Sequence, residues 1–247
     1  MQRYKCVIAY DGSQFSGFQI QPQARTVQGE IEAVLKKMHK GKRMKVVGSG
    51  RTDAGVHAYG QVVHFDSPLQ IEEAKWQTAL NSLLPADIVF RSIVKTDQAF
   101  HARHSAIAKE YRYKIYTSPS RNPFKRHYAL HFPFPLNTEK IKEAIPLLVG
   151  THDFTSFCSA KTDVAHKVRT VTSIDIREQG DELIFIFNGE GFLYHMVRIM
   201  TGTLLEIGNG KRQPEEITAI LQGKDRTLAG KTAPPEGLYL SSVFYDD

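Results

Sequence analysis

Hydrophobic and polar positions in the first hundred residues switch between the period of a strand and that of a helix. Apolar residues recur at helical spacing in two segments. One is 27–38, with Thr26 as its predicted N-cap, and the other is 71–83, which ends before Pro85. Strand-like patterns mark four more segments, 3–10, 44–48, 61–65 and 87–94. The predicted order is therefore β-α-β-β-α-β, with a glycine-rich turn region, 50–60, between the second and third strands.

The second half repeats this order more loosely. Strands are predicted at 109–116, 168–177, 182–188 and 238–245, and helices at 138–148, 193–207 and 214–221. Two β-α-β-β-α-β units in tandem are typical of the ferredoxin-like fold used twice. We therefore predict an α+β protein with two ferredoxin-like halves, 1–100 and 101–247. Their sheets are expected to join into one extended antiparallel sheet, with helices on one face and an active-site cleft on the other.

Composition excludes several classes of protein. Of the 247 residues, 41% are hydrophobic and 23% are charged, which argues against disorder and collagen-like repeats. The N-terminus runs directly into a strand-like pattern without the apolar stretch of a signal peptide, and no window approaches a membrane span. We expect a cytoplasmic protein that does not contact a membrane. In that reducing compartment Cys6 and Cys158 are expected to be small core residues rather than a disulfide.

The formal net charge of +6 favours a polyanionic partner without establishing one, because many basic proteins bind no nucleic acid. Basic side chains and histidines are concentrated around the first strand of the second half and its following loop. They are His101, Arg103, His104, Lys109, Arg112, Lys114, Arg121, Lys125, Arg126 and His127. Three more basic residues at 42, 43 and 45 extend the set. A solvated basic face and a phosphate-binding surface both fit this pattern.

The most informative segment is the glycine-rich stretch around Asp53. Glycines at 48, 50, 55 and 60 bracket Arg51, Thr52, Asp53 and His57, so the loop can present a side chain at the edge of a sheet. From residue types alone, an Asp-Ala-Gly turn in which Asp53 bonds its own backbone is the favoured interpretation. A P-loop is excluded because no Gly-Lys-Ser/Thr ending is present. A metal site of Asp53, His57 and His64 lacks any supporting ligand motif.

The segment Gly50-Arg51-Thr52-Asp53-Ala54-Gly55-Val56-His57-Ala58 resembles the signature loop of TruA-type tRNA pseudouridine synthases. Four further blocks are similar to that family in the same order: 10–28 with Tyr-Asp-Gly, 109–113, 191–198 and 233–240. Two positions depart from the family, with Phe18 where Trp is usual and His195 where Asn is common. The five matches extend from residue 10 to residue 240 and so cover nearly the whole chain.

The resemblance implies an isomerase that detaches uracil from its ribose, turns it and reattaches it through carbon, with no cofactor and no catalytic metal. It implies that Asp53 is the catalytic nucleophile and that Arg198 is the cation that keeps this carboxylate ionised. It assigns Tyr111 to the active site, stacked on the flipped base and assisting proton transfer. Tyr113, by contrast, is expected to be an ordinary strand residue. Arg51 is implied to hold the flipped state and Leu238 to pack against the target base.

The resemblance also implies the partner and the place of the reaction. The substrate is tRNA, modified in the anticodon stem-loop at about positions 38 to 40, with recognition by shape and backbone. Family members act as homodimers in which one tRNA spans both subunits. The alternative to a synthase is a non-catalytic basic RNA-binding module, which explains the charge but not the set of Arg51, Asp53, Tyr111 and Arg198. A metal-dependent hydrolase is a third class, disfavoured by its ligand spacing.

Overall fold

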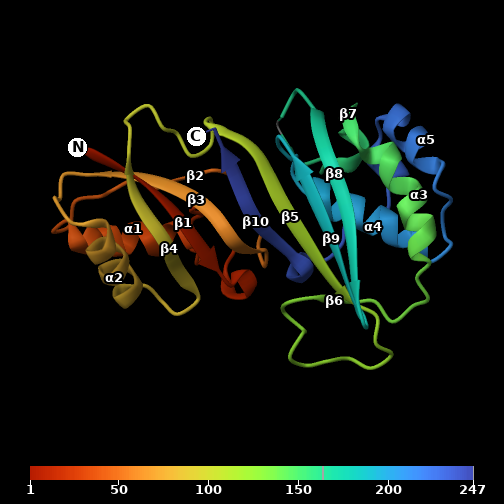
Figure 1. Cartoon of the computed structure of the whole chain (residues 1–247), viewed down its shortest axis with the longest axis horizontal. Coiled ribbons are helices and arrows are strands. Elements are labelled where there is room, and N and C mark those ends of the chain that lie inside the picture. The colour runs from red at the N-terminus through yellow and green to blue at the C-terminus, as the bar shows by residue number, and fades with distance from the viewer. Residues whose placement is uncertain (163, 247) are drawn as a thin grey trace. The chain divides into compact units, whose positions relative to one another are not determined.

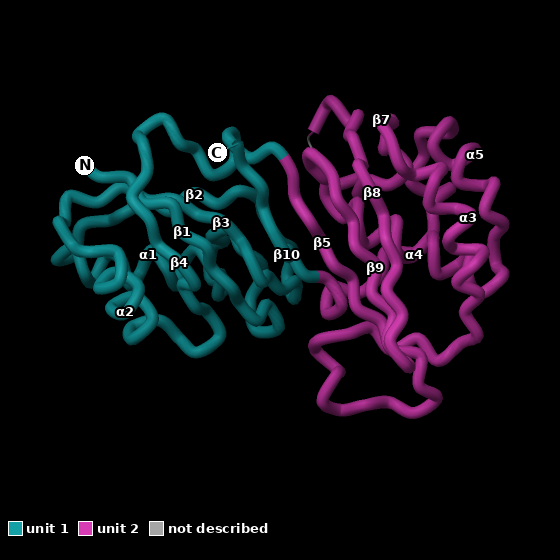
Figure 2. Tube along the Cα trace, in the orientation of Figure 1, with its two compact units in different colours: residues 1–107, 239–247 teal, residues 108–238 magenta. Residues whose placement is uncertain are grey.

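The computed structural model describes residues 1–162 and 164–246. The chain forms two compact units (Figure 2): unit 1 is Met1–Ile107 together with the segment from Tyr239 onward, and unit 2 is Ala108–Leu238. The sequence placed the boundary near residue 100 and the closing strand in the second half. In the closing strand, Tyr239 and Leu240 lie in parallel register with His57 and Ala58 of unit 1. The expected division into residues 1–100 and 101–247 stays a prediction.

Unit 1 has a sheet with the strand order β4-β1-β3-β10, and a short strand β2 pairs with β3. The strands are β1 (Gln2–Tyr10), β2 (Val47–Gly48), β3 (His57–Ser67), β4 (Ile88–Thr96) and β10 (Leu238–Tyr245). The helices are α1 (Val27–Met38) and α2 (Glu73–Leu83), both labelled in Figure 1. Strand β1 runs antiparallel to both β3 and β4, so it occupies the middle of the sheet.

The core of unit 1 lies between its sheet and its two helices. Every second residue of β1 from Tyr4 onward is buried, which shows that one face of the strand is covered. The Trp76 ring of α2 meets both Tyr4 and Phe65 edge-on, with ring centroids 5.6 and 5.5 Å apart. His39, which caps the C-terminus of α1, stacks on the same indole at 6.0 Å. Both helices therefore pack against the face that carries Tyr4.

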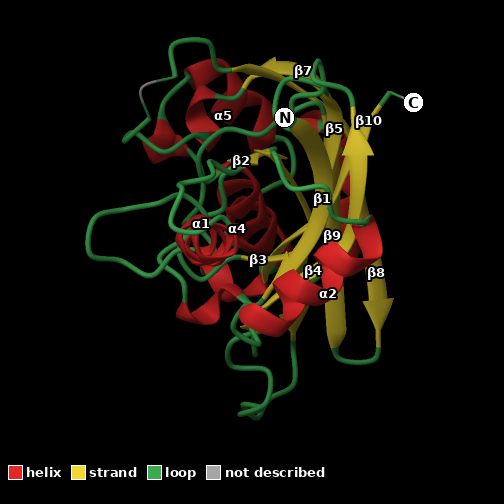
Figure 3. Cartoon of the chain, turned by 90° about the vertical axis from the view of Figure 1, so that its left-hand side faces the viewer, coloured by secondary structure: helices red, strands yellow, loops and turns green. Residues whose placement is uncertain are grey.

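Unit 2 has its own sheet, with the order β5-β9-β8-β7, and the short β6 pairs in parallel with β5. Its strands are β5 (Ala106–Tyr116), β6 (Leu130–His131), β7 (Gly150–Asp153), β8 (Val168–Gln179) and β9 (Glu182–Gly189). Its helices are α3 (Thr138–Leu148), α4 (Met196–Gly208) and α5 (Glu216–Gly223). Figure 3 shows α4 and α5 together with the strands of this unit. Helix α4 is buried along most of its length, because almost every residue from Met196 to Gly208 is apolar or small.

The predicted α+β class is confirmed, and each predicted helix and strand has a counterpart in the structure. Strands β6 and β7 and four short 3₁₀ helices, at 12–14, 155–157, 226–228 and 235–237, were not predicted. Strand β3 begins at His57 and not at residue 61, so the glycine at position 60 lies inside a strand. A β-carbon there would lie 2.5 Å from the carbonyl oxygen of Ser241. Gly60 therefore allows β10 to approach β3 closely and does not form a turn. The joining of the two sheets stays a prediction.

Both cysteines are buried and unpaired with one another, as predicted. Among the described residues no helix is long and apolar enough to cross a membrane.

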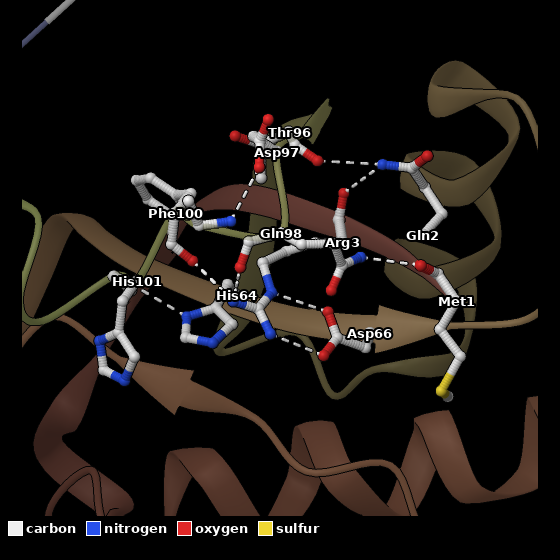
Figure 4. A network of polar contacts seen from close by, with 12 residues as sticks. Met1, Gln2, Arg3, His64, Asp66, Thr96, Asp97, Gln98, Phe100 and His101 are labelled. Carbon is white, nitrogen blue, oxygen red and sulfur yellow. Dashed lines mark hydrogen bonds and ion pairs between the residues drawn. The ribbon is translucent and has the colours of Figure 1, made fainter.

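A polar network attaches the segment after β4 to the start of β1 and the end of β3 (Figure 4). The Arg3 guanidinium makes two hydrogen bonds of 2.8 Å to the Asp66 carboxylate. It also donates to the carbonyl oxygens of Gln98 and Phe100, at 2.7 and 2.8 Å. The Ala102 amide donates to Nδ1 of His64 at 3.1 Å. Because Nδ1 accepts this bond, the structure requires the neutral imidazole at this position.

This network makes the stability of the protein depend on pH. Burial lowers the pKa of His64 to about 4, and the nearby Arg3 and His101 act in the same direction, while Asp66 opposes them. The folded pKa is therefore below the roughly 6.5 of an unfolded histidine. The stabilisation is full above about pH 6.5 and is lost as the pH falls toward 4, since the unfolded state then binds more protons.

We expect the free energy of unfolding to fall by about 2 kcal/mol between pH 7 and pH 5 through His64 alone. The His64→Asn variant keeps an acceptor near the position of Nδ1 but cannot be protonated. Its urea unfolding curves at the two pH values should show a correspondingly smaller difference than those of the wild type. Equal pH dependence in both proteins would show that His64 is not the responsible group.

Candidate active site

The loop that carries Asp53 is fastened at its beginning to the strand that follows it. The Ser49 amide donates to the Val62 carbonyl oxygen at 2.8 Å, and the Ser49 hydroxyl donates to Oε1 of Gln61 at 2.6 Å. The buried Gln61 side chain in turn donates from Nε2 to the Gly50 carbonyl oxygen at 3.0 Å. The loop therefore begins at a defined position on β3.

The N-terminal block holds the middle of the same loop. The Phe18 amide donates to the Thr52 carbonyl oxygen at 3.1 Å, and the Gly55 amide donates to the Phe15 carbonyl oxygen at 3.2 Å. The Tyr10 hydroxyl bonds the buried Thr52 hydroxyl at 2.8 Å. Burial raises the pKa of Tyr10, so its phenol stays protonated and available for this bond. Residues 10–18 thus fix the backbone on both sides of Asp53.

Close packing against this loop explains two glycines of the block. A β-carbon at Gly12 would lie 2.0 Å from the Val56 carbonyl oxygen, and one at Gly17 would lie 2.8 Å from the Thr52 carbonyl oxygen. Gly17 also has a φ of +96°, a backbone conformation that residues other than glycine rarely adopt. The two glycines allow the N-terminal block to lie directly against the backbone of the Asp53 loop.

The end of the loop is supported by aromatic rings. Nδ1 of His57 accepts a hydrogen bond from the Gly12 amide at 3.0 Å. The His57 ring stacks on Tyr239 of β10 with centroids 4.6 Å apart, and Tyr59 stacks on the same ring at 4.8 Å. The C-terminal block, which contains Tyr239, therefore supports the strand that begins directly after the loop.

The Asp53 backbone forms a turn, and its side chain is half-buried. The Val56 amide donates to the Asp53 carbonyl oxygen at 3.1 Å, and Gly55 has a φ of +76°. Thr52 points into the core, whereas Arg51 and Ala54 are exposed. The turn interpretation is thus right about the backbone, and the turn also presents a carboxylate at the surface of unit 1.

Tyr111 lies in β5 of unit 2, where Phe187 of β9 is its cross-strand partner. Its ring meets Phe192 edge-on at 5.2 Å and is almost entirely buried. Tyr113, two residues on, is fully buried and donates from its hydroxyl to the Pro234 carbonyl oxygen at 2.7 Å. Tyr113 therefore has the structural role that the sequence predicted for it.

Arg198 lies in the first turn of α4 and is half-buried between buried neighbours on the helix. Its Nε donates to the Ala233 carbonyl oxygen at 2.8 Å, and the Ala233 amide donates to the Arg198 carbonyl oxygen at 3.0 Å. A β-carbon at Gly202, one turn further along, would lie within bonding distance of the Lys231 carbonyl oxygen. Residues 231–233 therefore lie directly on α4 and orient the Arg198 side chain.

Leu238 begins β10 and is buried. The residue before it, Gly237, approaches β5 so closely that a β-carbon would lie 2.7 Å from the Lys114 carbonyl oxygen. The structure thus places Arg51 and Asp53 on one loop of unit 1, and Tyr111, Arg198 and Leu238 in unit 2. The pairing of Asp53 with Arg198 stays a prediction.

Comparison with known proteins adds an independent observation. A family model described as tRNA pseudouridine synthase matches residues 6–105 and 144–246. The chain is 58% identical over 246 residues to tRNA pseudouridine synthase A of Geobacillus kaustophilus (strain HTA426), a match that covers 100% of this chain and 95% of that protein. This chain belongs to the tRNA pseudouridine synthase family.

A second relative in the family is tRNA pseudouridine synthase A of Bacillus subtilis (strain 168). It is 54% identical over 246 residues, which cover 99% of this chain and 100% of that protein. Among solved structures, a chain of a Cbf5-Nop10-Gar1 complex matches with a TM-score of 0.37 and 12% identity, over 98% of this chain and 60% of that chain. So remote a likeness carries no argument.

Within the family pattern, the structure gives a physical account of His195. This residue precedes α4 with φ 63° and ψ 4°, a left-handed conformation. Asn tolerates that conformation better than most side chains, and His is also enriched there. The Asn that is common at this position and the His found here therefore satisfy the same backbone requirement. The His195 ring also lies against Tyr194, with centroids 3.9 Å apart.

Several of the basic residues that suggested an RNA surface are paired within the chain. Arg112 bonds Glu110, Arg43 bonds Glu32, and Lys125 bonds Glu182, with nitrogen–oxygen distances of 2.8, 3.2 and 2.7 Å. The positive charge of each of these side chains is offset locally by its neighbouring carboxylate.

The alternative metal site of Asp53, His57 and His64 is not formed in the described part of the chain, where no group of three or more such side chains is gathered. The Nδ1 atoms of His57 and His64 both accept backbone hydrogen bonds instead. Sequence reasoning missed the supporting roles of Tyr10, Gln61 and Tyr239. Tyr10 and Tyr239 lie inside the sequence blocks that resemble the family. Those blocks were therefore the signal that could have identified these two residues.

Proposed function

We propose that the chain converts uridine to pseudouridine in the anticodon stem-loop of tRNA, at about positions 38 to 40, with Asp53 as its nucleophile. The reaction is an isomerisation: the bond between ribose and N1 of uracil breaks, and a bond between ribose and C5 forms. The proton released from C5 and the proton taken up at N1 balance, so no oxidant, reductant or cofactor is required. The observation that supports the proposal best is the loop of Asp53, which is held at its beginning, middle and end by backbone and aromatic contacts.

A carboxylate can serve this reaction first as nucleophile and then as base. Such a group must be positioned before the substrate arrives, because misplacement by about 1 Å costs roughly a hundredfold in rate. The bonds from Phe15, Phe18 and Tyr10 to the residues around Asp53 supply that positioning. The half-buried side chain remains accessible to a substrate.

Arg198 is the proposed cation for this carboxylate. The bond from its Nε to the Ala233 carbonyl oxygen orients the side chain, and a guanidinium can hold a carboxylate in bidentate geometry. Tyr111 is proposed to stack on the flipped base, with its hydroxyl assisting proton transfer at carbon. Its edge contact with Phe192 holds the ring in one orientation. Leu238 is proposed to pack against the same base.

A uridine inside an RNA stem must leave the stack before Asp53 can reach it, which costs a few kcal/mol. Arg51, exposed and two residues before Asp53, is proposed to fill the space that the base leaves. The exposed basic side chains are proposed to contact phosphates, so affinity should fall steeply with salt. We further propose that the enzyme acts in the cytoplasm as a homodimer in which one tRNA spans both subunits.

Mapping pseudouridine in tRNA from cells with and without this protein tests the proposed site of action. We expect modification to disappear at about positions 38 to 40 and to persist elsewhere, because the enzyme recognises the shape around one stem-loop. Expression of the wild-type chain should restore it, and expression of the Asp53→Asn variant should not. Loss confined to another arm of tRNA would contradict the anticodon assignment while leaving synthase activity itself intact.

A further inference from the structure

A segment without regular secondary structure lies along helix α4 of unit 2. It consists of residues 229–234, which connect the 3₁₀ helices at 226–228 and 235–237, and we call it the strap. Its amides and carbonyl groups have no sheet or helix of their own to pair in, so they need other partners. Helix α4 provides several of them.

Two amides of the strap donate to side chains of α4. The Gly230 amide donates to the Thr203 hydroxyl oxygen at 2.9 Å. The Lys231 amide donates to Oε1 of Glu206 at 3.0 Å. The Thr203 hydroxyl is fully buried and itself donates to the Ile199 carbonyl oxygen at 2.9 Å. This second bond fixes the orientation in which Thr203 receives the strap.

The backbones of the strap and of α4 are in close contact. A β-carbon at Gly230 would lie 2.8 Å from Cα of Thr203, and one at Gly202 would meet the Lys231 carbonyl oxygen more closely still. Residue 230 thus lies beside residue 203, whereas Ala233 bonds residue 198. The strap therefore runs antiparallel to α4 over more than one turn of the helix.

The remainder of the strap is held as well. The Tyr113 hydroxyl of β5 donates to the Pro234 carbonyl oxygen at 2.7 Å. Before the strap, the Arg226 guanidinium donates to the Thr232 hydroxyl at 3.0 Å. Ala233 therefore lies between two fastened parts of the strap.

The fastened strap presents the Ala233 carbonyl group to Arg198. That oxygen accepts from Nε of Arg198 at 2.8 Å, and the Ala233 amide donates to the Arg198 carbonyl oxygen at 3.0 Å. An arginine side chain is long and flexible, so an acceptor held at Nε restricts the direction of its guanidinium group. A displaced strap would move this acceptor, and the guanidinium group with it.

We propose that Thr203 and Glu206 are positioning residues, which act on Arg198 through the strap and take no direct part in the chemistry. The proposal rests on the proposed function, in which Arg198 is the cation for the catalytic carboxylate. A misplacement of about 1 Å at such a group costs roughly a hundredfold in rate. Loosening the strap should therefore slow the reaction in a protein that is still folded.

A strap that only completes the core of unit 2 is the competing interpretation. Ala229 and Ala233 are buried, so the strap does cover apolar surface. In that case its loosening would lower the free energy of unfolding and leave the turnover of the folded protein unchanged. The two interpretations are separated by kinetics measured where urea unfolding shows every variant to be folded.

Thr203→Val provides the first test, because valine has nearly the same shape and lacks the hydroxyl that accepts from the Gly230 amide. We expect kcat for pseudouridine formation to fall at least about tenfold. KM for tRNA should stay within about threefold, since phosphate contacts made elsewhere provide most of the affinity. Thr203→Ser restores the hydroxyl and should bring kcat back to within about threefold of the wild type.

Thr201→Val is the matched control. Thr201 is as fully buried as Thr203 and makes the same kind of bond within the helix, from its hydroxyl to the Val197 carbonyl oxygen at 2.8 Å. In the described part of the chain it makes no hydrogen bond to the strap. The control should keep the kcat of the wild type within about threefold, the range allowed for Thr203→Ser.

Glu206→Ala provides a second test that does not change a fully buried residue. Glu206 and Glu216 both pair with Arg212, with nitrogen–oxygen distances of 2.7 and 3.4 Å, but Glu206 also accepts from the strap. Glu216→Ala is therefore its control. We expect kcat to fall at least about fivefold in Glu206→Ala and to remain at the wild-type level in Glu216→Ala.

Hydrogen exchange of the Gly230 and Lys231 amides, measured by mass spectrometry without RNA, reports on the strap itself. We expect faster exchange in Thr203→Val and Glu206→Ala, because each loses an acceptor for one of these amides. Thr201→Val and Glu216→Ala should exchange as the wild type does. This measurement does not depend on the reaction that the protein catalyses.

The outcomes separate this proposal from the proposed function. Unchanged exchange in Thr203→Val, or a wild-type kcat in a variant whose strap exchanges faster, would overturn the positioning role. Arg198→Gln is measured beside them. Normal turnover in Arg198→Gln would refute the role of Arg198 in the proposed function, and the positioning role with it. Loss of turnover in Arg198→Gln but not in Thr203→Val would refute the positioning role alone.

Discussion

Replacement of Asp53 by Asn is expected to abolish pseudouridine formation while leaving tRNA affinity within about threefold. Asn has nearly the same shape as Asp, so the turn with its hydrogen bond from the Val56 amide to the Asp53 carbonyl oxygen should persist. An amide, however, is neither a nucleophile nor a base at neutral pH. Because phosphate contacts made elsewhere provide most of the affinity for RNA, binding should survive.

The rate of tritium release from C5 of uridine in tRNA measures this effect, and a filter-binding titration measures affinity. The expected loss in turnover is at least about 10³-fold, in the range for a group that acts directly on the reacting atoms. Asp97→Asn is the matched control, since its Oδ1 accepts a bond from the Ala99 amide that an Asn oxygen can also accept. Normal turnover by Asp53→Asn would remove Asp53 from the mechanism.

Helices with clear sequence signals were predicted to the residue. Helix α1 follows Thr26, whose hydroxyl accepts from the Gly29 amide, and α3 follows Asn137, whose side chain accepts from the Lys140 amide. Such caps act within one turn of the helix and are therefore visible in the sequence. Strands β6 and β7 were missed because two and four residues are too few to show a period of two.

Contacts between distant segments could not be predicted in the same way. The glycine at position 60 was taken for part of a turn, although it lies in β3, where the Ser241 carbonyl oxygen comes close. The pairing of β10 with β3 also joins residues far apart in the chain. Local patterns contain no information on which strand approaches which.

In the candidate site, too, local sequence signals identified residues, whereas contacts between distant segments were not predicted. The motif blocks named Asp53, Tyr111 and Arg198 but did not say why the N-terminal and C-terminal blocks accompany them. The structure supplies a reason for each block. Tyr10 of the N-terminal block bonds Thr52 beside Asp53, and the carbonyl oxygen of Ala233 in the C-terminal block accepts a hydrogen bond from the Arg198 side chain. These are tertiary contacts, and no spacing within either block indicates them.

Gly12 provides the sharpest test of the packing of the N-terminal block against the Asp53 loop. We expect Gly12→Ala to lower kcat by about a hundredfold or more and to destabilise the protein by about 1–3 kcal/mol. The added β-carbon would lie 2.0 Å from the Val56 carbonyl oxygen and 3.1 Å from the His57 amide nitrogen. Both neighbours are backbone atoms and cannot rotate away, so the end of the Asp53 loop must move.

Gly41→Ala is the control for this variant. Gly41 has a φ of +90°, so alanine is strained there and should also cost stability, but no atom lies within 4 Å of its added β-carbon. Urea unfolding measures stability in both variants, and steady-state kinetics on tRNA measure kcat and KM. If the Asp53 loop depends on Gly12, only Gly12→Ala loses turnover at conditions where both proteins are folded. Equal kcat in the two variants would show that the close approach of Gly12 supports the fold alone and not the position of the carboxylate.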